Sequence, residues 1–512
     1  MTRVAGSTVF RRYPGAPAHN QRAALDFAHT EIAMNRHTST PRRLPLAGLV
    51  LAFVAGPCAT AGAAPTAQAI DTLPLVGQGT AAPTTFNIRF YTNCDDDGMG
   101  SLRQAVNASV SGDSVRASPT LSCSTITLQS PLTFGQADLD IQGLGSGRTT
   151  ITAAASVDGG LINHIGSGRL NLQFLTLTGG HKYNSSAQAK GGCVYSAGDV
   201  AINGSRITGC MAKGLGSQAA VGGGVFSEGL TSLRLSEVSG NVAASASGTY
   251  TSGGGMYAVG GVDMDRSVVA ANAATTTTNS WGGGFTTPGA VTIVNSAIIN
   301  NQARVSGGAH IHPASGSVNT ITNTTVSGNS AWRVGGLTCV GGTFTIASST
   351  ITANVSLFGD SGGRIIGGGL DLGAGTHTIV STLVTGNLVA DADFIDSINL
   401  SGSSGASLGT GGNHDHISGS TLALPSGTIT TPSQLLPLAL NGASRPTHAL
   451  RPTDPDVDAG SAPSGQTYDQ RGAPFLRTVG AQADIGAFEL DPDLIFRDAF
   501  DASIPTIPVP SL

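Results

Sequence analysis

Glycine clusters recur at a nearly constant interval through the middle of the sequence. They begin at Gly191, Gly222, Gly253, Gly282, Gly307, Gly335 and Gly367, so subtraction gives spacings of 31, 31, 29, 25, 28 and 32 residues. From the second cluster on, each is followed by an apolar run, an alternating segment with a small hydroxyl residue, and a segment that ends in Asn241, Asn272, Asn301, Asn329, Asn354 or Asn387. Such a period is typical of solenoids, in which each repeat buries its apolar side against its neighbours.

Composition indicates that the repeats are made of strands. The chain has 72 Gly among 512 residues, 40% hydrophobic residues and only 11% charged residues. This is too apolar for a disordered chain and too rich in glycine for a helical one. Glycine, hydroxyl and β-branched residues favour short strands joined by tight turns. We therefore expect an all-β protein, a right-handed parallel β-helix over residues 86–425.

The recurrent asparagines have a structural explanation in such a fold. Equivalent residues of successive coils lie about 4.8 Å apart. At that distance side-chain amides can hydrogen-bond from coil to coil, and Asn tolerates the left-handed conformation of a corner. Between each Asn and the next cluster we expect a variable loop rich in Ala, Ser and Thr.

The N-terminus has the three-part pattern of a secretory signal. A basic segment with Arg36, Arg42 and Arg43 precedes an apolar run from Leu44 to Ala55 and the small residues Ala61-Gly62-Ala63. We assign residues 34–63 to a signal peptide, 64–85 to a linker, and 1–33 to a disordered, over-extended start before Met34. The apolar run is too short to span a bilayer, and no transmembrane segment is expected elsewhere.

Export would permit disulfides among the cysteines that follow the signal. Cys94 and Cys123 flank the first folded segment, and Cys193 and Cys210 lie in one repeat, so each couple is a candidate pair. Cys210 stands where later repeats carry Asn. Cys339 is the odd cysteine, and we interpret it as a small buried apolar residue.

The segment before the repeats predicts the first coils and a cap. Phe86–Tyr91, Thr125–Leu128, Leu139–Ile141 and Thr150–Thr152 alternate like strands. Between the first two, Leu102, Ala105 and Val106 have helical spacing. A solenoid needs its open end covered, so we expect this short helix to cap the N-terminal coil.

The segment before the repeats and the repeats themselves each resemble a known family. The segment Cys94–Val106, with Ser111-Gly112-Asp113 and Cys123–Leu128 after it, resembles the N-terminal region of secreted bacterial right-handed parallel β-helix proteins with a CSLREA-type segment. The glycine clusters with recurrent Asn resemble the repeats of chlamydial-type polymorphic outer-membrane proteins, although Val, Ile or Leu replaces their Phe. Both resemblances imply a secreted β-helix.

The C-terminal segment resembles the choice-of-anchor Q module over roughly Pro432 to Leu490. The matching residues are Asn441-Gly442, Pro446–Leu450, Asp458-Ala459-Gly460, Asp469–Gly472 and Asp484–Glu489. We assign residues 426–490 to this module and 491–512 to a tail, which is either a sorting element or a disordered end. The resemblance implies an extracellular or cell-surface location.

Few residues have a pattern that chemistry would need. Asp263 and Asp265 share one face of an expected strand and Arg266 follows them, which makes them the best candidates for an enzyme acting on polysaccharide. Asp138 and Asp140 have the same spacing. A solvated strand also produces such pairs, so our primary expectation is that the chain has no catalytic residues.

No metal site or cofactor is expected. His310 and His312 would share a strand face, and His414-Asp415-His416 lies in a glycine-rich segment, but neither set completes a ligand pattern. Asp95–Asp97 lacks the ligand spacing of an EF-hand loop.

Aromatic residues provide candidate binding residues. Tyr183, Tyr250, Trp281 and Trp332 precede glycine clusters and would project from one edge, where rings can stack on sugars or anchor a protein. The alternative is that they fold back onto the coils. Tyr195, Phe226 and Tyr257 share one repeat position and are interpreted as a stack against the wall.

Two functions follow from these patterns. The first is a secreted or surface-associated monomer for display or adhesion, without chemistry, whose partner is a polysaccharide or surface glycan. The second is a polysaccharide lyase or glycoside hydrolase on a pectate-lyase-like β-helix. A net charge of -5 without a basic stripe excludes a nucleic-acid partner.

Overall fold

The computed structural model describes residues 86–245, 250–276, 278–358, 366–391, 394–396, 398–409, 415–462 and 465–492. All of them belong to one compact unit, Thr80–Phe500. The expected start segment, signal peptide and linker, and nearly all of the expected tail, lie outside these residues.

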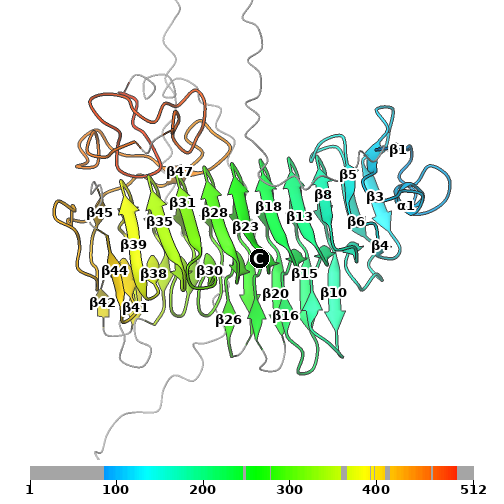
Figure 1. Cartoon of the computed structure of the whole chain (residues 1–512), viewed down its shortest axis with the longest axis horizontal. Helices are drawn as coiled ribbons and strands as arrows, with labels where there is room; N and C mark the ends of the chain where they lie inside the picture. The colour runs from blue at the N-terminus through cyan, green and yellow to red at the C-terminus, as the bar shows by residue number, and fades with distance from the viewer. Residues whose placement is uncertain are drawn as a thin grey trace, which may run out of the picture. The chain divides into compact units, whose positions relative to one another are not determined.

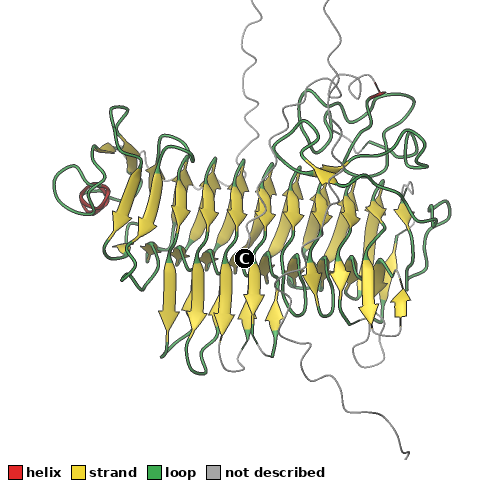
Figure 2. Cartoon of the chain, turned by 180° about the vertical axis from the view of Figure 1, so that it is seen from behind, coloured by secondary structure: helices red, strands yellow, loops and turns green. Residues whose placement is uncertain are grey.

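Three long sheets, here named A, B and C, have twelve, eleven and ten strands in the described part of the chain (Figures 1 and 2). The strands of sheet A are β1 (Ile88–Tyr91), β2 (Ser114–Ala117), β5 (Leu139–Gln142), β8 (Arg169–Gln173), β13 (Asp199–Asn203), β18 (Leu230–Arg234), β23 (Gly261–Asp265), β28 (Ala290–Val294), β31 (Val318–Thr322), β35 (Thr343–Ala347), β39 (Gly375–Val380) and β44 (Ala406–Leu408). The strands of sheet B are β3 (Thr125–Leu128), β6 (Thr150–Ala153), β9 (Thr176–Thr178), β14 (Arg206–Thr208), β19 (Glu237–Ser239), β24 (Val268–Ala270), β29 (Ala297–Ile299), β32 (Thr325–Ser327), β36 (Thr350–Thr352), β40 (Leu383–Val384) and β45 (His416–Ile417). The strands of sheet C are β4 (Leu132–Phe134), β7 (Ile162–His164), β12 (Val194–Ser196), β17 (Val225–Ser227), β22 (Met256–Ala258), β27 (Phe285–Thr287), β30 (Ala309–Ile311), β34 (Leu337–Cys339), β38 (Leu370–Leu372) and β43 (Leu400–Gly402).

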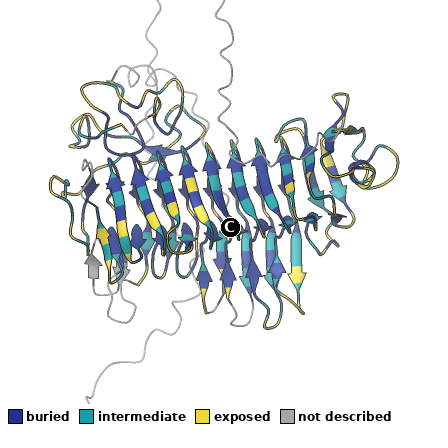
Figure 3. Ribbon diagram, viewed as in Figure 1, coloured by how far each residue is buried: buried dark blue, intermediate teal, exposed yellow. Residues whose placement is uncertain are grey.

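The chain visits sheets C, A and B in turn and then enters the next coil, so each strand pairs in parallel with its equivalent one coil away. This confirms the predicted parallel β-helix. Many strand residues are buried (Figure 3), and they form a continuous apolar core; in sheet A one row of them contains Ile202, Leu233, Met264 and Ile293, all fully buried. Cys339 lies in the same core, and burial raises the pKa of its thiol.

The predicted helix is present as α1 (Leu102–Asn107), and its N-cap Ser101 accepts a hydrogen bond from the amide of Gln104. Leu102, Ala105 and Val106 are buried, and α1 lies beside β1 at the N-terminal end of the solenoid (Figure 1). Within the described residues no helix is long and apolar enough to cross a bilayer.

Both predicted disulfides are present. Cys94 pairs with Cys123, and Cys193 pairs with Cys210. These bonds are consistent with an oxidising, extracellular environment.

The six predicted asparagines form a buried ladder. In each step the side-chain amide donates to the Oδ1 of the Asn one coil further on, as from Asn241 to Asn272 at 3.0 Å and from Asn272 to Asn301 at 3.0 Å. The ladder extends beyond the prediction to Asn399, which accepts from Asn387 at 2.9 Å. We expected the ladder residues themselves to be left-handed, but this is wrong: the residue before each Asn has the positive φ, as at Ala271 (53°) and Asn300 (55°).

A second ladder of hydroxyl groups runs along the corner between sheets A and B. The amide of Ser205 donates to the Oγ of Ser236 at 3.2 Å, and the amide of Ser236 donates to the Oγ of Ser267 at 3.1 Å. The same pattern continues through Ser296, Thr324, Ser349 and Thr382.

The loops expected between each Asn and the next glycine cluster are partly strands. In four coils they form two further parallel sheets, which together we call the wing (Figure 1). One sheet contains β10 (His181–Asn184), β15 (Met211–Gly214), β20 (Val242–Ser245) and β25 (Ala273–Thr275), and the other contains β11 (Ala189–Lys190), β16 (Ala220–Val221), β21 (Thr251–Ser252) and β26 (Ser280–Trp281). Buried Ala189, Ala212, Ala220 and Ala243 pack together within the wing.

Glycine is needed where the wing returns to sheet C. Gly222 has a φ of +63°, and a Cβ on Gly223 would lie 2.1 Å from the carbonyl oxygen of Gly254. Later coils have a smaller sheet at this side, made of β33 (Ser330–Ala331), β37 (Val355–Ser356), β41 (Leu388–Asp391) and the antiparallel β42 (Phe394–Asp396).

The C-terminal module (residues 426–490) contains the antiparallel pair β46 (Leu438–Ala439) and β47 (Thr447–His448). It lies against the outer face of sheet B over the last coils, where Leu383 packs with Leu450, Ile485 and Phe488. Hydrogen bonds also join it to this face, including one of 2.6 Å from Thr325 Oγ1 to Gln470 Oε1.

Candidate functional site

The predicted catalytic residues lie on the outer face of sheet A, and both carboxylates are ion-paired. Asp263 accepts two hydrogen bonds from Arg234, at 3.1 and 2.5 Å. Asp265 accepts one from Arg266 at 3.0 Å and another from Asn295 at 3.3 Å. Asp263 and Asp265 therefore share a face as predicted, but each is engaged by its own neighbours.

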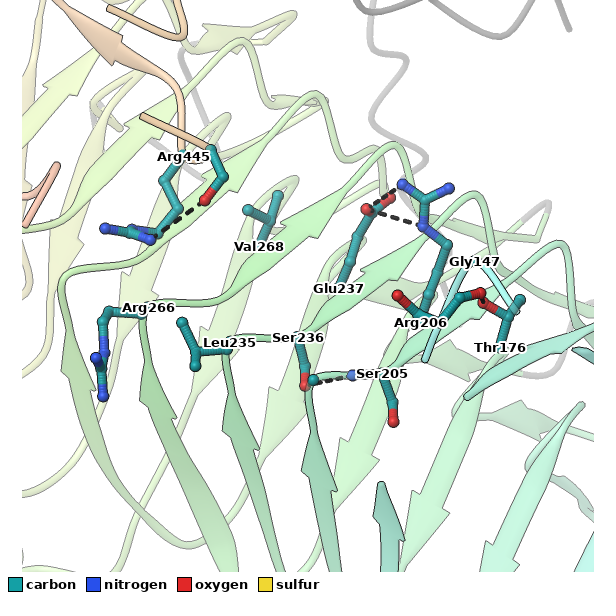
Figure 4. A pocket seen from close by; sticks show the side chains of 13 residues that line it. Gly147, Thr176, Ser205, Arg206, Leu235, Ser236, Glu237, Arg266, Val268 and Arg445 are labelled. Atoms are coloured by element: carbon teal, nitrogen blue, oxygen red, sulfur yellow. Dashed lines mark hydrogen bonds and ion pairs between the residues drawn. The ribbon is translucent and has the colours of Figure 1, made fainter. Parts of the chain in front are cut away.

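Of these three residues, Arg266 lines a pocket at the corner between sheets A and B (Figure 4). This corner pocket has a volume of about 400 Å³. Its wall includes Arg206 and Glu237 from sheet B and Arg445 from the C-terminal module. Neither Asp263 nor Asp265 is among its lining residues.

The local backbone explains why side chains gather here. Leu235 and Arg266 turn the chain from sheet A into sheet B with φ values of 50° and 49°. The hydroxyl ladder residues Ser205 and Ser236 follow the turn and satisfy the buried corner amides. In each coil, the residue at the corner and the first residue of the sheet B strand therefore lie on the same side of the solenoid. They are about 4.8 Å from the equivalent residues of the next coil.

Guanidinium groups dominate the charge of the corner pocket. Arg206 donates to Glu237 at 3.0 and 2.6 Å, and Ser239 donates to the other oxygen of that carboxylate at 2.6 Å. Arg266 and Arg445 add two more guanidinium groups; Arg266 is paired with Asp265 outside the lining, and Glu237 is the one carboxylate among the lining residues. The pocket therefore favours an anionic group.

Arg445 is held in place by main-chain oxygens. It is only 5% exposed and donates to the carbonyl of Gln470 at 3.0 Å and to that of Arg471 at 2.7 Å. Burial, and then the neighbouring charge of Arg266, lowers the pKa of its guanidinium. An anion bound beside Arg266 and Arg445 would act to raise the pKa of the Arg445 guanidinium and so offset this lowering.

The predicted binding aromatics do not form one platform. Trp332 contacts Phe358, with ring centroids 4.8 Å apart, and the guanidinium of Arg304, 4.3 Å from its centroid. Tyr250 pairs with Trp281 at 5.8 Å, and Tyr183 pairs with His181 at 5.7 Å. Each ring is thus engaged within the protein, although Tyr183, Tyr250 and Trp332 are each about two-fifths exposed.

The second aromatic set stacks as the sequence indicated. Tyr195, Phe226 and Tyr257 have successive centroids 5.7 Å apart and nearly parallel planes. Lys190 lies over Phe226, which is only 2% exposed. Because these faces cover one another, the stack offers little ring surface to a sugar.

The histidines considered as ligands have other contacts. The rings of His310 and His312 lie 5.1 Å apart, and burial lowers the pKa of His310 to about 3, so its ring is neutral. His414 lies outside the described residues, whereas His416 binds Asp456 at 2.6 Å. In the described part of the chain no three His, Cys, Asp or Glu side chains are grouped to hold a metal ion.

The remaining acidic candidates have structural contacts. Asp96 pairs with Arg103 at 2.7 Å, and Asp97 accepts from the amide of Gly98. Asp138 accepts from the amide of Arg169, and Asp140 accepts from Asn171 at 3.1 Å.

The other three charged residues of the corner pocket were not predicted. Arg206 and Glu237 occupy the same position of successive repeats, directly after Ser205 and Ser236, so opposite charges at one repeat position were a usable signal. Arg445 had no such signal, because only the packing of the C-terminal module on the solenoid places it there.

No protein-family model matches this sequence, and no curated protein matches it. Among solved structures, the chain is similar to a crystal structure of pectate lyase Pel9A, with 13% sequence identity and a TM-score of 0.39. The match covers 80% of this chain and 97% of the other. At this level of similarity it carries no inference about activity.

Proposed function

We propose that this chain is a non-enzymatic, secreted or cell-surface β-helix for display or adhesion, and that its corner pocket binds an acidic glycan. The observation that carries the proposal is that Arg206, Arg266 and Arg445 line one pocket whose lining includes a single carboxylate. Guanidinium groups bind carboxylate and sulfate groups through paired, charge-assisted hydrogen bonds.

The state of the acidic side chains supports binding without chemistry. Glycoside hydrolysis uses two carboxyl groups that flank the scissile bond. Here Asp263, Asp265 and Glu237 are all ion-paired with arginine. The polysaccharide lyase or glycoside hydrolase remains the second hypothesis, and turnover is part of the test below.

The sequence resemblances belong to the same proposal. The signal-like segment 34–63 directs export, the CSLREA-like segment begins the solenoid, and the choice-of-anchor Q-like module serves surface attachment. The partner is a polysaccharide or surface glycan, and the protein acts as a monomer.

The direct test measures binding of carboxylated, sulfated and neutral oligosaccharides by titration calorimetry, together with release of products. Arg266→Asn is a suitable variant, because Asn295 and Asn323 occupy the same corner position in the next coils. We expect binding of an acidic oligosaccharide that weakens with salt, and a loss of affinity of about ten-fold in the variant.

Arg169→Asn is the matched control, since Arg169 is exposed and lies outside the pocket. Equal binding of neutral and acidic sugars would contradict the proposed ligand. Product release that Asp263→Ala abolishes would contradict the absence of chemistry and favour the second hypothesis.

A further inference from the structure

Two separate parts of the chain form the corner pocket. Arg206, Glu237 and Arg266 come from the middle coils of the solenoid, and Ser444 and Arg445 come from the C-terminal module (Figure 4). An anion in the pocket would therefore contact both parts.

The position of Arg445 depends on how the module sits on sheet B. The carbonyls that hold its guanidinium belong to Gln470 and Arg471. Gln470 in turn donates to the carbonyl of Pro446 at 3.0 Å and accepts from Thr325 Oγ1 at 2.6 Å. Gln470 and Thr325 are both fully buried, so this chain of hydrogen bonds links Arg445 to the solenoid away from water.

Two guanidinium groups come together at this contact. Arg266 on the solenoid and Arg445 on the module carry like charges, and Asp265 is already paired with Arg266. Burial and then the proximity of Arg266 lower the pKa of Arg445, whereas the nearby carboxylates of Asp265 and Asp469 act to raise it. A bound carboxylate or sulfate would add an attraction to a guanidinium group on each of the two parts.

We infer that the corner pocket is a composite site, in which binding of an acidic sugar and docking of the C-terminal module on the solenoid stabilise each other. The inference rests on the proposed function and adds its regulation. Coupling of this kind is reciprocal: the factor by which the ligand raises the docking constant equals the factor by which docking raises ligand affinity, so a change that leaves the module largely undocked must lower that affinity.

The experiment uses the full chain with oligogalacturonate as the carboxylated probe and a heparin-derived oligosaccharide as the sulfated probe. Hydrogen exchange is measured with and without each probe, and affinity is measured by titration. We expect the probe that binds to slow exchange of the module, including the amides of Gln470 and Arg477, which lie outside the pocket lining.

Thr325→Val separates coupling from direct contact. It removes the hydroxyl that donates to Gln470 without changing any residue that lines the pocket. We expect affinity for the probe to fall about five-fold or more and exchange of the module to accelerate. Thr292→Val is the matched control, because Thr292 is exposed on sheet A, and it should leave both measurements unchanged.

The outcomes distinguish the two proposals. If a probe binds but the module is not protected and Thr325→Val binds normally, coupling is wrong and the proposed function stands. If neither probe binds the unaltered chain, the proposed function fails, and the coupling fails with it. Arg445→Gln supplies a second variant: normal affinity in that variant would overturn the composite site even if Thr325→Val folds poorly.

Discussion

The side-chain amide of Asn301 makes four hydrogen bonds inside the solenoid. Its Nδ2 donates to the carbonyl of Val269 at 3.0 Å and to Oδ1 of Asn329 at 2.9 Å. Its Oδ1 accepts from the backbone amide and the side-chain amide of Asn272, both at 3.0 Å. The Asn301 side chain thus joins the coil before it to the coil after it.

Asn301→Ala should therefore be strongly destabilising. Asn301 is fully buried, and its truncation leaves several buried donors and acceptors without partners. We expect a loss of about 3 kcal/mol or more in the free energy of unfolding, measured by denaturant titration. Asn163→Ala is the control: Asn163 is half-buried on the outer face of sheet C, and its loss should cost less than about 1 kcal/mol. Similar costs for both variants would contradict the role of the ladder.

A single carboxylate makes the first coil sensitive to acid. Burial acts to raise the pKa of Asp113, but hydrogen bonds from Val110, Arg89 and Asn87 outweigh it and hold the pKa below its usual value. The carboxyl loses its proton more readily in the folded state than in the unfolded state. Its contribution to the free energy of unfolding is therefore fully present above the pKa of the unfolded state, and it is lost as the pH falls through the pKa of the folded state.

Asp113→Asn tests this dependence. At pH 7 the variant should be less stable by about 1 to 2 kcal/mol, and the difference from the unaltered chain should shrink below about pH 4, where Asp113 of the unfolded chain takes up its proton first. Thermal unfolding between pH 2.5 and 7 measures both. A difference that stays constant across this range would show that the charge is not responsible.

Among the elements, the first wing coil combines a disulfide with the start of the Asn ladder. Cys210 donates its backbone amide to Oδ1 of Asn241 at 3.0 Å, so it stands at the ladder position, while its sulfur is bonded to Cys193. The bond closes a loop with a sequence separation of 17 residues. A covalent link thus replaces one amide step.

Replacing both cysteines tests how far an Asn at the ladder position can substitute for the disulfide. Cys193→Ala with Cys210→Ala should lower stability by about 3 kcal/mol, from loop-closure entropy. Cys193→Ala with Cys210→Asn should lose less, because the new amide can donate to Asn241 and extend the ladder. The midpoints of denaturant unfolding of the two double variants give the comparison, and equal midpoints would contradict it.

How far sequence predicts an element here depends on how local its cause is. The helix α1, the parallel β-helix and the Asn ladder were predicted, because helical spacing, alternation and a 25- to 32-residue repeat are patterns of the sequence itself. The disulfides were predicted because each couple of cysteines lies in one segment of the chain. The wing was expected as loops, since its strands are held by packing of small residues such as Ala212 and Ala243 across coils. In the corner pocket, Arg266 was singled out, but Arg445 reaches it only through a contact between distant segments.

At the scale of the whole described unit, the solenoid and the C-terminal module have separate apolar cores. The module's core consists of Leu450, Ile485, Phe488 and Leu490 with one solenoid residue, Leu383. Because Leu383 is the one solenoid residue among the buried members of this cluster, we expect the module to open at a lower free energy than the coils unfold.

Ile485→Ala should loosen the module alone. Ile485 is 1% exposed, and its truncation should cost about 2 to 5 kcal/mol of local stability. Hydrogen exchange should accelerate in the module and stay slow at the Asn ladder. Ile321→Ala, a fully buried residue of sheet A, should give the opposite pattern. Acceleration of the whole unit by Ile485→Ala would show that solenoid and module unfold together.

The two ladders keep a fixed distance along the chain. Ser236 to Asn241, Ser267 to Asn272 and Ser296 to Asn301 are each five residues apart by subtraction, whereas the distance from those asparagines to the next glycine cluster is 12, 10 and 6 residues. An insertion after Gly216, in a wing turn, should therefore be tolerated, and a single residue inserted after Val238 should not be; soluble yield and unfolding midpoint distinguish them. In evolutionary terms, insertions between an Asn and the next glycine cluster can add surface to any repeat without new mutations in the core. Related proteins can therefore change their binding surface while they keep the same solenoid.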